Sequence, residues 1–532
     1  MIGRSTRARR RDAQASVASD RELLGTGELP EAGTGLPEVS GIPETADEPG
    51  PAPARSHDDG ARPGKPGYDR APWLIALAVF ATFLPISVFR YLRLDPTSWD
   101  LGIFTEYVKQ SAHLHAPIVD IRRSGYDLLG DHFQPIVALI APFFRLFPTP
   151  VTLLVAQALL AAVSVIPVSR AAAAKLGTGA GRAIGAAYGF SWGLQQMVNY
   201  DFHEIAFAVP LLACSLSALV RGRTRAAVWW AVPLVFVKED QGFTIAAIGI
   251  LMALVYREKV TGLLLAGWGL AWSLLCIFVI EPHFSGLHTY YFWTEGGVIN
   301  PNGGHFSASG LIAQVFAGSG TKLPTLALIL LPTAFLALRS PLVLAAVPSL
   351  ALRFVATNPY YWGTDWHYNA TVMPIVFIAA IDGMVRIRAA RDAGLPVRLT
   401  GPLERYGPGL MLGAAAALAF QFPLSQLWTP QTYTISPHVA AARAAMAKVP
   451  DGATVATDLD LLAPLAGRTD TYWLGNFSTN PATQYIVFDT ASTDWQPPPS
   501  NVLTFVESLN HGTHYRQIYS DDGVYVFIRA GR

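Results

Sequence analysis

Charged residues are scarce in this sequence of 532 residues. They make up 14% of the chain, against roughly 25% in soluble globular domains, which excludes an ordinary soluble enzyme and a coiled coil. The formal net charge is only +1, so no overall field attracts nucleic acid. The two cysteines, Cys214 and Cys276, both lie in apolar runs, which argues against a disulfide scaffold or a zinc–cysteine site.

Nucleotide-binding motifs are missing as well. The sequence contains neither a G-x-x-x-x-G-K-[ST] loop nor a G-x-G-x-x-G turn with the flanking strand and helix that such a site needs. A soluble activated nucleotide is therefore not expected as the donor in any reaction of this protein.

Apolar residues are abundant instead, at 51% of the chain with a mean hydropathy of +0.31. Between residues 71 and 428, apolar runs alternate with short polar breaks. Because about 20 residues cross the hydrocarbon core, these runs predict a mainly α fold, a polytopic bundle of about eleven transmembrane helices. The expected spans are 72–90, 150–171, 182–199, 204–220, 225–237, 241–256, 260–280, 322–338, 341–356, 369–387 and 408–427.

Two further zones flank the bundle. Residues 1–70 are rich in Pro, Gly and charge without apolar periodicity, which predicts a disordered cytoplasmic tail. Residues 429–532 show the sequence pattern of a small α/β domain, and the eleven spans place this domain outside the cell. Its expected helices are 438–448, 459–466 and 502–510, and its expected strands are 454–457, 484–489, 515–519 and 523–529.

The distribution of basic residues predicts the orientation. With the N-terminus in the cytoplasm, Lys and Arg fall in the inner loops, while the long outer loop 281–321 has none; this is the pattern of a plasma-membrane protein. Every histidine between residues 71 and 427 then lies on the outer side: His113, His115, His132, His203, His283, His288, His305 and His367.

The first outer loop, 91–149, carries two candidate sites. Asp100, in SWDLGIF, is either a general base at the membrane surface or the N-cap of a helix that begins at Leu101. Asp131 and His132, in GDHFQP, could bind a phosphate or a metal, or could orient the loop.

Two tight breaks between spans carry more acids. In NYDFHE, Asp201, His203 and Glu204 could converge as metal ligands or as an acid pair, or could form a solvated turn. VKEDQGF places Lys238, Glu239 and Asp240 between two apolar runs, where charges usually line a cavity. Lys238 is the natural partner of a phosphate oxygen.

The last candidates are aromatic-rich. The loop 281–321 is either a lid over a substrate or a set of membrane-belt anchors. Arg353 lies deep in an apolar run and needs an anionic partner, either Asp240, Glu239 or a lipid phosphate. Beyond it, the side chains suited to a sugar ring are Trp362, Trp366, His367 and Tyr368.

Together these residues favour an integral enzyme that acts on a lipid phosphate at the outer leaflet. SWDLGIF, GDHFQP, YDFHEIAF, VKEDQG and DWHYNATVMPIVF also resemble the bacterial membrane-protein family known as domain of unknown function 2079, over about residues 75–490. That family is grouped with the type C glycosyltransferase fold, whose members use polyprenyl-phosphate sugars. The resemblance implies that Asp100 is the catalytic base. This sequence departs from the family pattern at Glu204, where the family would have Pro, which puts a role for Glu204 in doubt.

The sequence thus predicts a glycosyltransferase that moves a sugar, with inversion, from a polyprenyl-phosphate donor to a glycan or protein acceptor on the outer face. Asp100 is the expected base, Lys238 and Arg353 the phosphate ligands, and no nucleic acid is expected as a partner. The sequence identifies no cofactor with certainty; a divalent ion held by Asp201 and His203 is possible, and Lys238 and Arg353 could make it unnecessary. The alternatives are a transporter or flippase of lipid-linked or polymer intermediates and a non-catalytic membrane scaffold.

Overall fold

The computed structural model of the chain describes residues 69–96, 98–286, 288–290, 292, 308–394, 400–510 and 512–531. The described residues belong to one compact unit, Tyr68–Arg532. The expected tail 1–70 lies outside the described residues except for its last two positions. Much of the loop 281–321 also lies outside them, so its interpretation as a lid stays a prediction.

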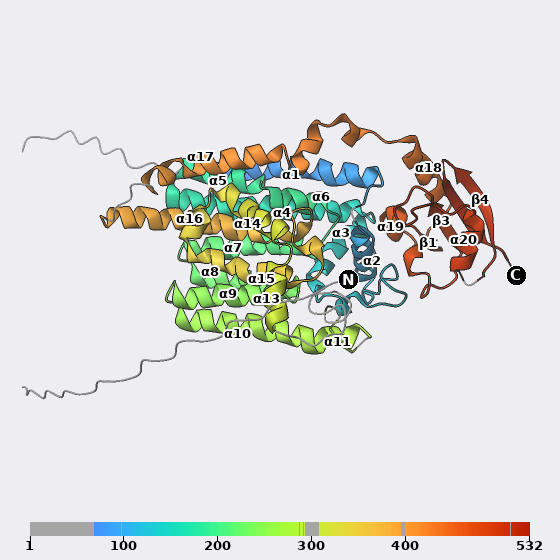
Figure 1. Cartoon of the computed structure of the whole chain (residues 1–532), viewed down its shortest axis with the longest axis horizontal. Coiled ribbons are helices and arrows are strands. Elements are labelled where there is room, and N and C mark those ends of the chain that lie inside the picture. The colour runs from blue at the N-terminus through green and yellow to red at the C-terminus, as the bar shows by residue number, and fades with distance from the viewer. Residues whose placement is uncertain are drawn as a thin grey trace, which may run out of the picture. The chain divides into compact units, whose positions relative to one another are not determined.

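Helices dominate the fold, and the longest lie side by side (Figure 1). In the described part of the chain, four helical segments are long and apolar enough to cross a membrane. They are Ala71–Leu92 (α1), Val151–Leu176 (α4), Lys259–Phe284 (α10, Lys259–Leu275, continued to α11, Glu281–Phe284) and His367–Asp392 (containing α16, Val372–Asp392). The segment with α16 is the most buried of the four, so α16 is the centre of the packing.

Shorter helices occupy the other expected spans, and several are interrupted at proline. For example, α8 ends at Ala231, and a 3-10 turn that contains Pro233 continues to Phe236, because proline removes a helical hydrogen bond. The number of spans therefore stays a prediction. The shorter helices are α5 (Thr178–Gly189), α6 (Trp192–Asn199), α7 (Ala208–Val220), α8 (Thr224–Ala231), α9 (Gln241–Leu254), α13 (Ala308–Phe316), α14 (Ser319–Leu330), α15 (Val347–Val355) and α17 (Thr400–Ala419).

Glycines bring α9 and α10 into backbone contact. A Cβ on Gly249 would lie 2.5 Å from the carbonyl oxygen of Gly262, and a Cβ on Gly242 would collide with the carbonyl of Gly269. Small residues at such positions let two helices approach closely in a membrane protein. The start of α9 is therefore held tightly against α10.

The loop between α1 and α4 forms two helices, α2 (Asp100–Ala112) and α3 (Ala141–Leu146). A 3-10 turn, Pro135–Ile140, precedes α3. Leu139, Phe143 and Leu146 are exposed along this stretch, as expected for a segment that lies in the membrane interface.

The C-terminal part of the chain forms a five-stranded sheet in the order β2-β1-β3-β5-β4. β1 pairs in parallel with β2 and β3, and β5 pairs antiparallel with β3 and β4. The strands and helices are β1 (Thr454–Thr457), β2 (Asp470–Trp473), β3 (Tyr485–Asp489), β4 (Tyr515–Asp521), β5 (Val524–Arg529), α18 (Pro437–Met446), α19 (Leu459–Ala466) and α20 (Val502–Leu509). These elements match the expectation except for β2, which the sequence pattern did not reveal. The division of the chain at residue 428 stays a prediction.

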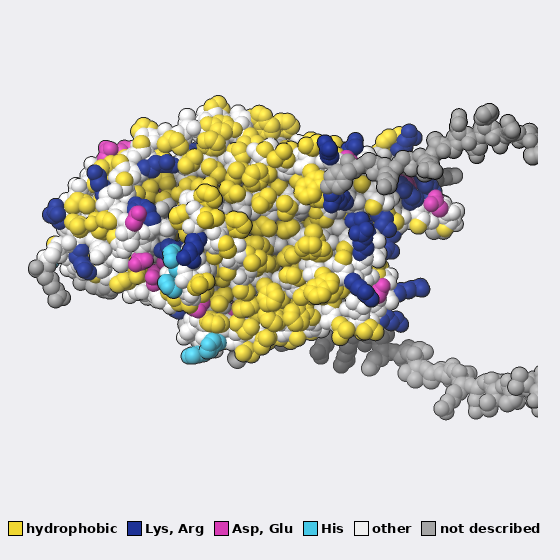
Figure 2. All heavy atoms as spheres, turned by 180° about the vertical axis from the view of Figure 1, so that it is seen from behind, with side chains coloured by type: hydrophobic (Ala, Val, Ile, Leu, Met, Phe, Trp, Pro, Cys, Tyr) yellow, Lys and Arg dark blue, Asp and Glu magenta, His cyan; other side chains and the backbone are white. Residues whose placement is uncertain are grey.

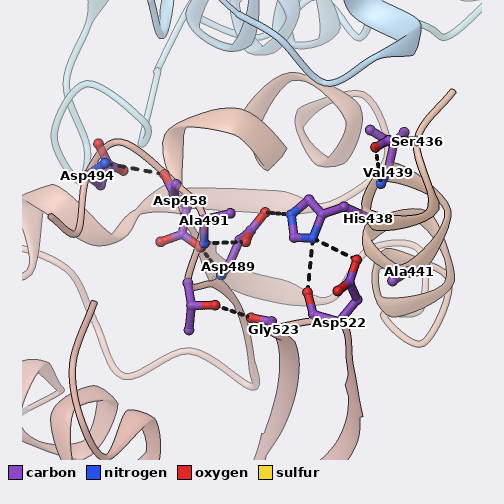
Figure 3. Close-up of polar contacts among 12 residues, drawn as sticks. Ser436, His438, Val439, Ala441, Asp458, Asp489, Ala491, Asp494, Asp522 and Gly523 are labelled. Atoms are coloured by element: carbon purple, nitrogen blue, oxygen red, sulfur yellow. Dashed lines mark hydrogen bonds and ion pairs between the residues drawn. The ribbon is translucent and has the colours of Figure 1, made fainter. Parts of the chain in front are cut away.

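Polar contacts hold α18 to the sheet (Figure 3). The Nε2 atom of His438 lies 2.9 Å from the carboxylate of Asp489 at the end of β3, and its Nδ1 atom lies 2.9 Å from the backbone oxygen of Asp522. Asp458, which follows β1, accepts hydrogen bonds from the backbone of Asp489 and from the indole of Trp495. The carboxylates of Asp489 and Asp458 thus hold in place the loops that follow β3 and β1.

The sheet part also contacts α2 and the residues after it. Trp99 packs edge-on against Trp473 at 4.8 Å between ring centroids, and Lys109 donates to the backbone oxygen of Thr469 at 2.6 Å. The amide of Asn476 donates to the backbone oxygen of Ile121 at 2.9 Å. These contacts place the sheet beside the loop that carries Asp100.

Charge is divided between the two ends of the helices. Figure 2 shows a broad apolar band, with mostly Lys and Arg on one side of it and histidines, acids and some Lys and Arg on the other. The positive-inside rule assigns the basic end to the cytoplasm, in agreement with the expected orientation, which stays a prediction.

Candidate active site

A polar cavity of about 530 Å³ lies at the end of the bundle where α2 begins and α6 ends. Six separate segments meet there: the start of α2, the loop before α3, the turn after α6, the residues before α9, Phe292 after α11, and the segment before α16. The polar and aromatic residues that line it include Ser98, Asp100, Arg122, Asp131, His132, Tyr200, His203, Glu204, Lys238, Tyr361, Trp366, His367 and Tyr368.

A second, mainly apolar cavity of about 230 Å³ adjoins the first. Phe243 of α9, Ile277 of the α10–α11 segment and Leu352 of α15 form part of its wall. The residues common to both cavities are His132, Lys238, Phe292, Tyr361, His367 and Tyr368. A molecule with one polar and one apolar half could therefore occupy both cavities, with its junction near Lys238.

Asp100 is the first residue of α2, and its side chain faces the polar cavity rather than capping the helix. The hydroxyl of Tyr200 donates a hydrogen bond to its carboxylate, and the backbone N–H of Asp100 donates to Ser98 Oγ at 3.1 Å. Burial raises the pKa of Asp100 to about 6, although the hydrogen bonds from Tyr200 and Ser98 oppose that shift. A carboxylate with this pKa is suited to accept a proton near neutral pH.

Glu204 lies buried between the imidazole of His203 and the ammonium of Lys238. One carboxylate oxygen of Glu204 lies 2.7 Å from Nδ1 of His203, and the other lies 3.6 Å from Nζ of Lys238. Burial opposes the charge on Lys238, but the carboxylates of Glu204, Asp240 and Glu239 raise its pKa above the ordinary range. Lys238 therefore keeps its positive charge between the two cavities.

A second buried carboxylate belongs to Glu239. Its Oε1 atom accepts from the hydroxyl of Tyr290 at 3.0 Å and lies 2.8 Å from Nδ1 of His132. The imidazole of His132 stacks on Phe292 at 4.4 Å. Burial lowers the pKa of His132, but the charge of Glu239 outweighs it and raises that pKa overall. Glu239 therefore favours the protonated form of His132.

Aromatic rings line the opposite wall. His367 stacks on His203 at 3.7 Å, it is 2% exposed, and neither of its ring nitrogens has a hydrogen-bond partner among the described residues. Buried polar atoms are rarely left unpaired in native proteins, so these nitrogens are positioned to meet a ligand. Trp366 and Tyr368 line the same cavity, as the sugar-stacking prediction requires.

The structure places Trp362 elsewhere. It lines neither cavity; its indole N–H donates to the backbone oxygen of Ala356 at 2.9 Å, and the ammonium of Lys322 lies 4.2 Å from its ring. Its ring is thus already occupied, and we no longer regard Trp362 as a sugar-stacking residue.

Arg353 also differs from the expectation. Its guanidinium donates to the backbone oxygens of Tyr361, Gly363 and Tyr368 and to the side chain of Asn369, and no ion pair joins it to a carboxylate among the described residues. Carbonyl oxygens thus replace the anionic partner that we expected. Arg353 fixes the segment before α16 and lines the apolar cavity; a role in binding phosphate stays a prediction.

The remaining acids mainly orient loops. Asp201 accepts from the backbone N–H of Ser98 at 2.9 Å, Asp131 lies 3.7 Å from Arg122, and Asp240 accepts from the amide of Gln241 at 3.1 Å. In the part of the chain that the structure describes, no group of three or more His, Cys, Asp or Glu side chains is placed to hold a metal ion. Metal binding by Asp201 and His203 stays a prediction that this geometry does not support.

Tyr200 is the main site residue that sequence reasoning did not select, because it immediately precedes Asp201 and looks like an ordinary membrane-edge tyrosine. Glu204 was a candidate, but the family pattern, which would have Pro at this position, put its role in doubt. The structure buries it fully, with its carboxylate near His203 and Lys238. The signal that favoured a role for Glu204 is its position directly before an apolar run, where a carboxylate is costly unless it lines a cavity.

The comparisons with known proteins agree with this geometry. A family described as "Predicted membrane protein (DUF2079)" matches residues 90–526. The chain belongs to this family. The match covers every residue of both cavities and most of the sheet, and it confirms the resemblance found in the sequence. No curated protein matches the chain.

Solved structures identify the fold of this DUF2079 protein as that of the type C glycosyltransferases. ArnT from Cupriavidus metallidurans bound to undecaprenyl phosphate is similar with a TM-score of 0.51 at 14% identity, covering 86% of this chain and 97% of that chain. ArnT in the apo state gives 0.46 at 13%, with 86% and 96% covered. The apo oligosaccharyltransferase of Archaeoglobus fulgidus gives 0.36 at 12%, with 86% and 74% covered. At these identities the likeness shows the fold and not the reaction.

Proposed function

We propose that the protein is an integral membrane glycosyltransferase that moves a sugar from a polyprenyl-phosphate donor to an acceptor on the outer face of the membrane. The pair of adjoining cavities carries the proposal. One cavity is polar and contains Asp100, the other is mainly apolar, and Lys238 lines both. A polyprenyl-phosphate sugar has the same two halves joined by an anion.

The donor phosphate would lie at the junction of the cavities. Lys238 and His132 line that junction, and buried carboxylates raise the pKa of both side chains, which favours their cationic forms. Preorganised cations stabilise negative charge that develops on a leaving group. The likeness to ArnT, whose structure contains undecaprenyl phosphate, supports the choice of a polyprenyl carrier.

Asp100 would act as the general base. As the acceptor hydroxyl attacks the anomeric carbon, its proton passes to the carboxylate of Asp100. The bond between that carbon and the phosphate oxygen breaks, and the phosphate departs with the bonding electrons toward Lys238. A single displacement of this kind inverts the anomeric carbon. The rings of Trp366 and Tyr368 line the same cavity and would hold the sugar between them and Asp100.

The test uses the purified full-length protein with polyprenyl-phosphate mannose and with polyprenyl-phosphate arabinose, and follows cleavage of the donor by mass spectrometry. Asp100→Asn should lower turnover by roughly a hundredfold or more, because a positioned base contributes that much. Asp365→Asn is the matched control, since Asp365 is an exposed acid on the segment before α16.

Binding of undecaprenyl phosphate, measured by native mass spectrometry, tests the proposed carrier even if neither sugar is the natural one or the acceptor is missing. Lys238→Gln should weaken that binding roughly tenfold or more. Wild-type protein that neither binds undecaprenyl phosphate nor cleaves either donor would contradict the proposal. Equal turnover in Asp100→Asn and the wild type would remove Asp100 from the mechanism.

A further inference from the structure

A groove of about 690 Å³ runs along the lateral face of the bundle between α4, α7 and α8. It shares no residue with the polar or the apolar cavity of the site. Its long wall is apolar, and its lining includes Leu160, Val163, Ile166, Leu211, Cys214 and Ala218.

Three arginines line the end of this groove that lies farthest from the site. Arg170 comes from the last part of α4, and Arg221 and Arg223 come from the turn between α7 and α8. The guanidinium of Arg170 also lies 5.6 Å from the ring of Trp73. The groove is therefore apolar along its length and strongly cationic at one end.

The two arginines of the turn lack an acidic partner. Among the described residues, no ion pair joins a carboxylate to Arg221 or Arg223. Glu258 accepts a hydrogen bond from the hydroxyl of Thr224, the residue after Arg223. Burial, together with the charges of Arg223 and Arg170, lowers the pKa of Arg221. Like charges that repel one another in this way are stabilised by a shared anion.

The length of the groove indicates what carries that anion. α7 has 13 residues and rises about 20 Å, which exceeds the ~15 Å of one hydrocarbon leaflet. A free phosphate would use only the arginines and leave the apolar wall uncovered. A phospholipid matches both parts, because its phosphate accepts bidentate guanidinium bonds and its acyl chain covers apolar surface.

We propose that this groove binds an anionic phospholipid of the leaflet at the basic end, with its phosphate between Arg170, Arg221 and Arg223 and one acyl chain along α4 and α7. This lipid is separate from the polyprenyl donor, because its groove opens on another face and its headgroup lies at the other end of the helices. The inference is independent of the proposed reaction.

The test measures retention of dioleoylphosphatidylglycerol and dioleoylphosphatidylcholine by the full-length protein, using native mass spectrometry after extraction from nanodiscs. The wild type should retain phosphatidylglycerol in preference to phosphatidylcholine. The double variant Arg221→Gln, Arg223→Gln should retain phosphatidylglycerol roughly tenfold less. Val163→Trp, which fills the apolar wall without changing charge, should reduce it as well.

The matched control is Arg257→Gln, Lys259→Gln, which removes the same charge from exposed positions between α9 and α10. An equal loss of phosphatidylglycerol in this control, or no loss in the Arg221 and Arg223 variant, would overturn the proposal. So would binding of soluble glycerol 1-phosphate as tight as that of the lipid, since it would make the arginines a site for free phosphate. Single Arg223→Gln, at an exposed turn position, serves if the double variant does not fold.

Discussion

The contact between Asp100 and Tyr200 decides when the proposed base can work. The hydroxyl of Tyr200 donates to the carboxylate, and this bond opposes the burial that raises the pKa of Asp100 to about 6. Tyr200→Phe removes the donor, so the pKa of Asp100 should rise further. Because a base must be ionised to accept a proton, the acid limb of kcat/KM should move to higher pH, with activity roughly tenfold lower near pH 6 and less affected near pH 8.

The control for this prediction is Tyr433→Phe, since the hydroxyl of Tyr433 donates to the backbone oxygen of Leu427 and faces neither cavity. The pH–rate profiles of both variants and the wild type would be measured with the same donor. A Tyr200→Phe profile that drops equally at every pH would assign Tyr200 a role in structure or binding instead.

The position of a single residue was predictable where its side chain has only one favourable kind of environment. A lysine beside two acids between apolar runs, as at Lys238, signals a cavity, and the structure places it there. Arg353 and Trp362 were less predictable, because arginine and tryptophan bond equally well to backbone oxygens. Which partner is used depends on how distant segments converge, and periodicity carries no information on that.

At the scale of elements, His438 adds a polar link between α18 and the sheet to the apolar packing of Ala442 and Ala445 against the strands. Burial lowers the pKa of His438, but its bond to Asp489 and the charges of Asp489 and Asp522 raise it overall. A histidine with a raised pKa stabilises the folded state below its unfolded pKa of about 6.5, and this contribution is lost as pH rises through the folded value. The link should therefore weaken in mildly alkaline solution.

Hydrogen exchange of the amides of α18 measures this effect. Protection of residues 437–446, corrected for intrinsic exchange, should fall between about pH 6 and pH 8 in the wild type, by roughly fivefold at most for a pair this exposed. His438→Gln should show the lower protection at both pH values. His514→Gln is the control, because His514 is exposed and pairs with Glu507 on another element. A pH dependence that persists unchanged in His438→Gln would exclude His438 as its origin.

Elements were predicted best where periodicity is long or strong. β1 and α19 appear at the expected residues, Thr454–Thr457 and Leu459–Ala466. β2, Asp470–Trp473, was missed because four residues with an exposed aspartate show no clear alternation. It forms because β1 offers it a parallel edge, which is a tertiary effect.

At the scale of the whole molecule, the division of charge predicts which end faces the cytoplasm. A cysteine introduced at Ser478, exposed in the sheet part, should react with a membrane-impermeant maleimide in intact cells. A cysteine introduced at Lys259, exposed at the start of α10, should react only after the cells are opened. Both variants carry Cys214→Ala, so that the half-buried native thiol does not contribute. The reverse labelling pattern would contradict the orientation and place the candidate site in the cytoplasm.

The helical bundle and its apolar segments followed from hydropathy, because water and hydrocarbon impose the same constraint on every spanning helix. The meeting of six segments around the cavity that contains Asp100 did not follow from hydropathy. Helix order in space depends on side-chain packing, and the sequence of apolar runs leaves that order open. Only the structure shows which segments meet.

The glycine contact between α9 and α10 has one more consequence. Lys238 lies just before α9, and Ile277 of the apolar cavity lies in the segment that continues α10, so the same backbone contact sets their relative positions. Gly249 and Gly262 carry no charge and line neither cavity, yet a single methyl group on either would separate the two helices. A methyl group added between two helices inside the membrane would therefore shift Lys238 at the site, although it changes no charge and no polar group.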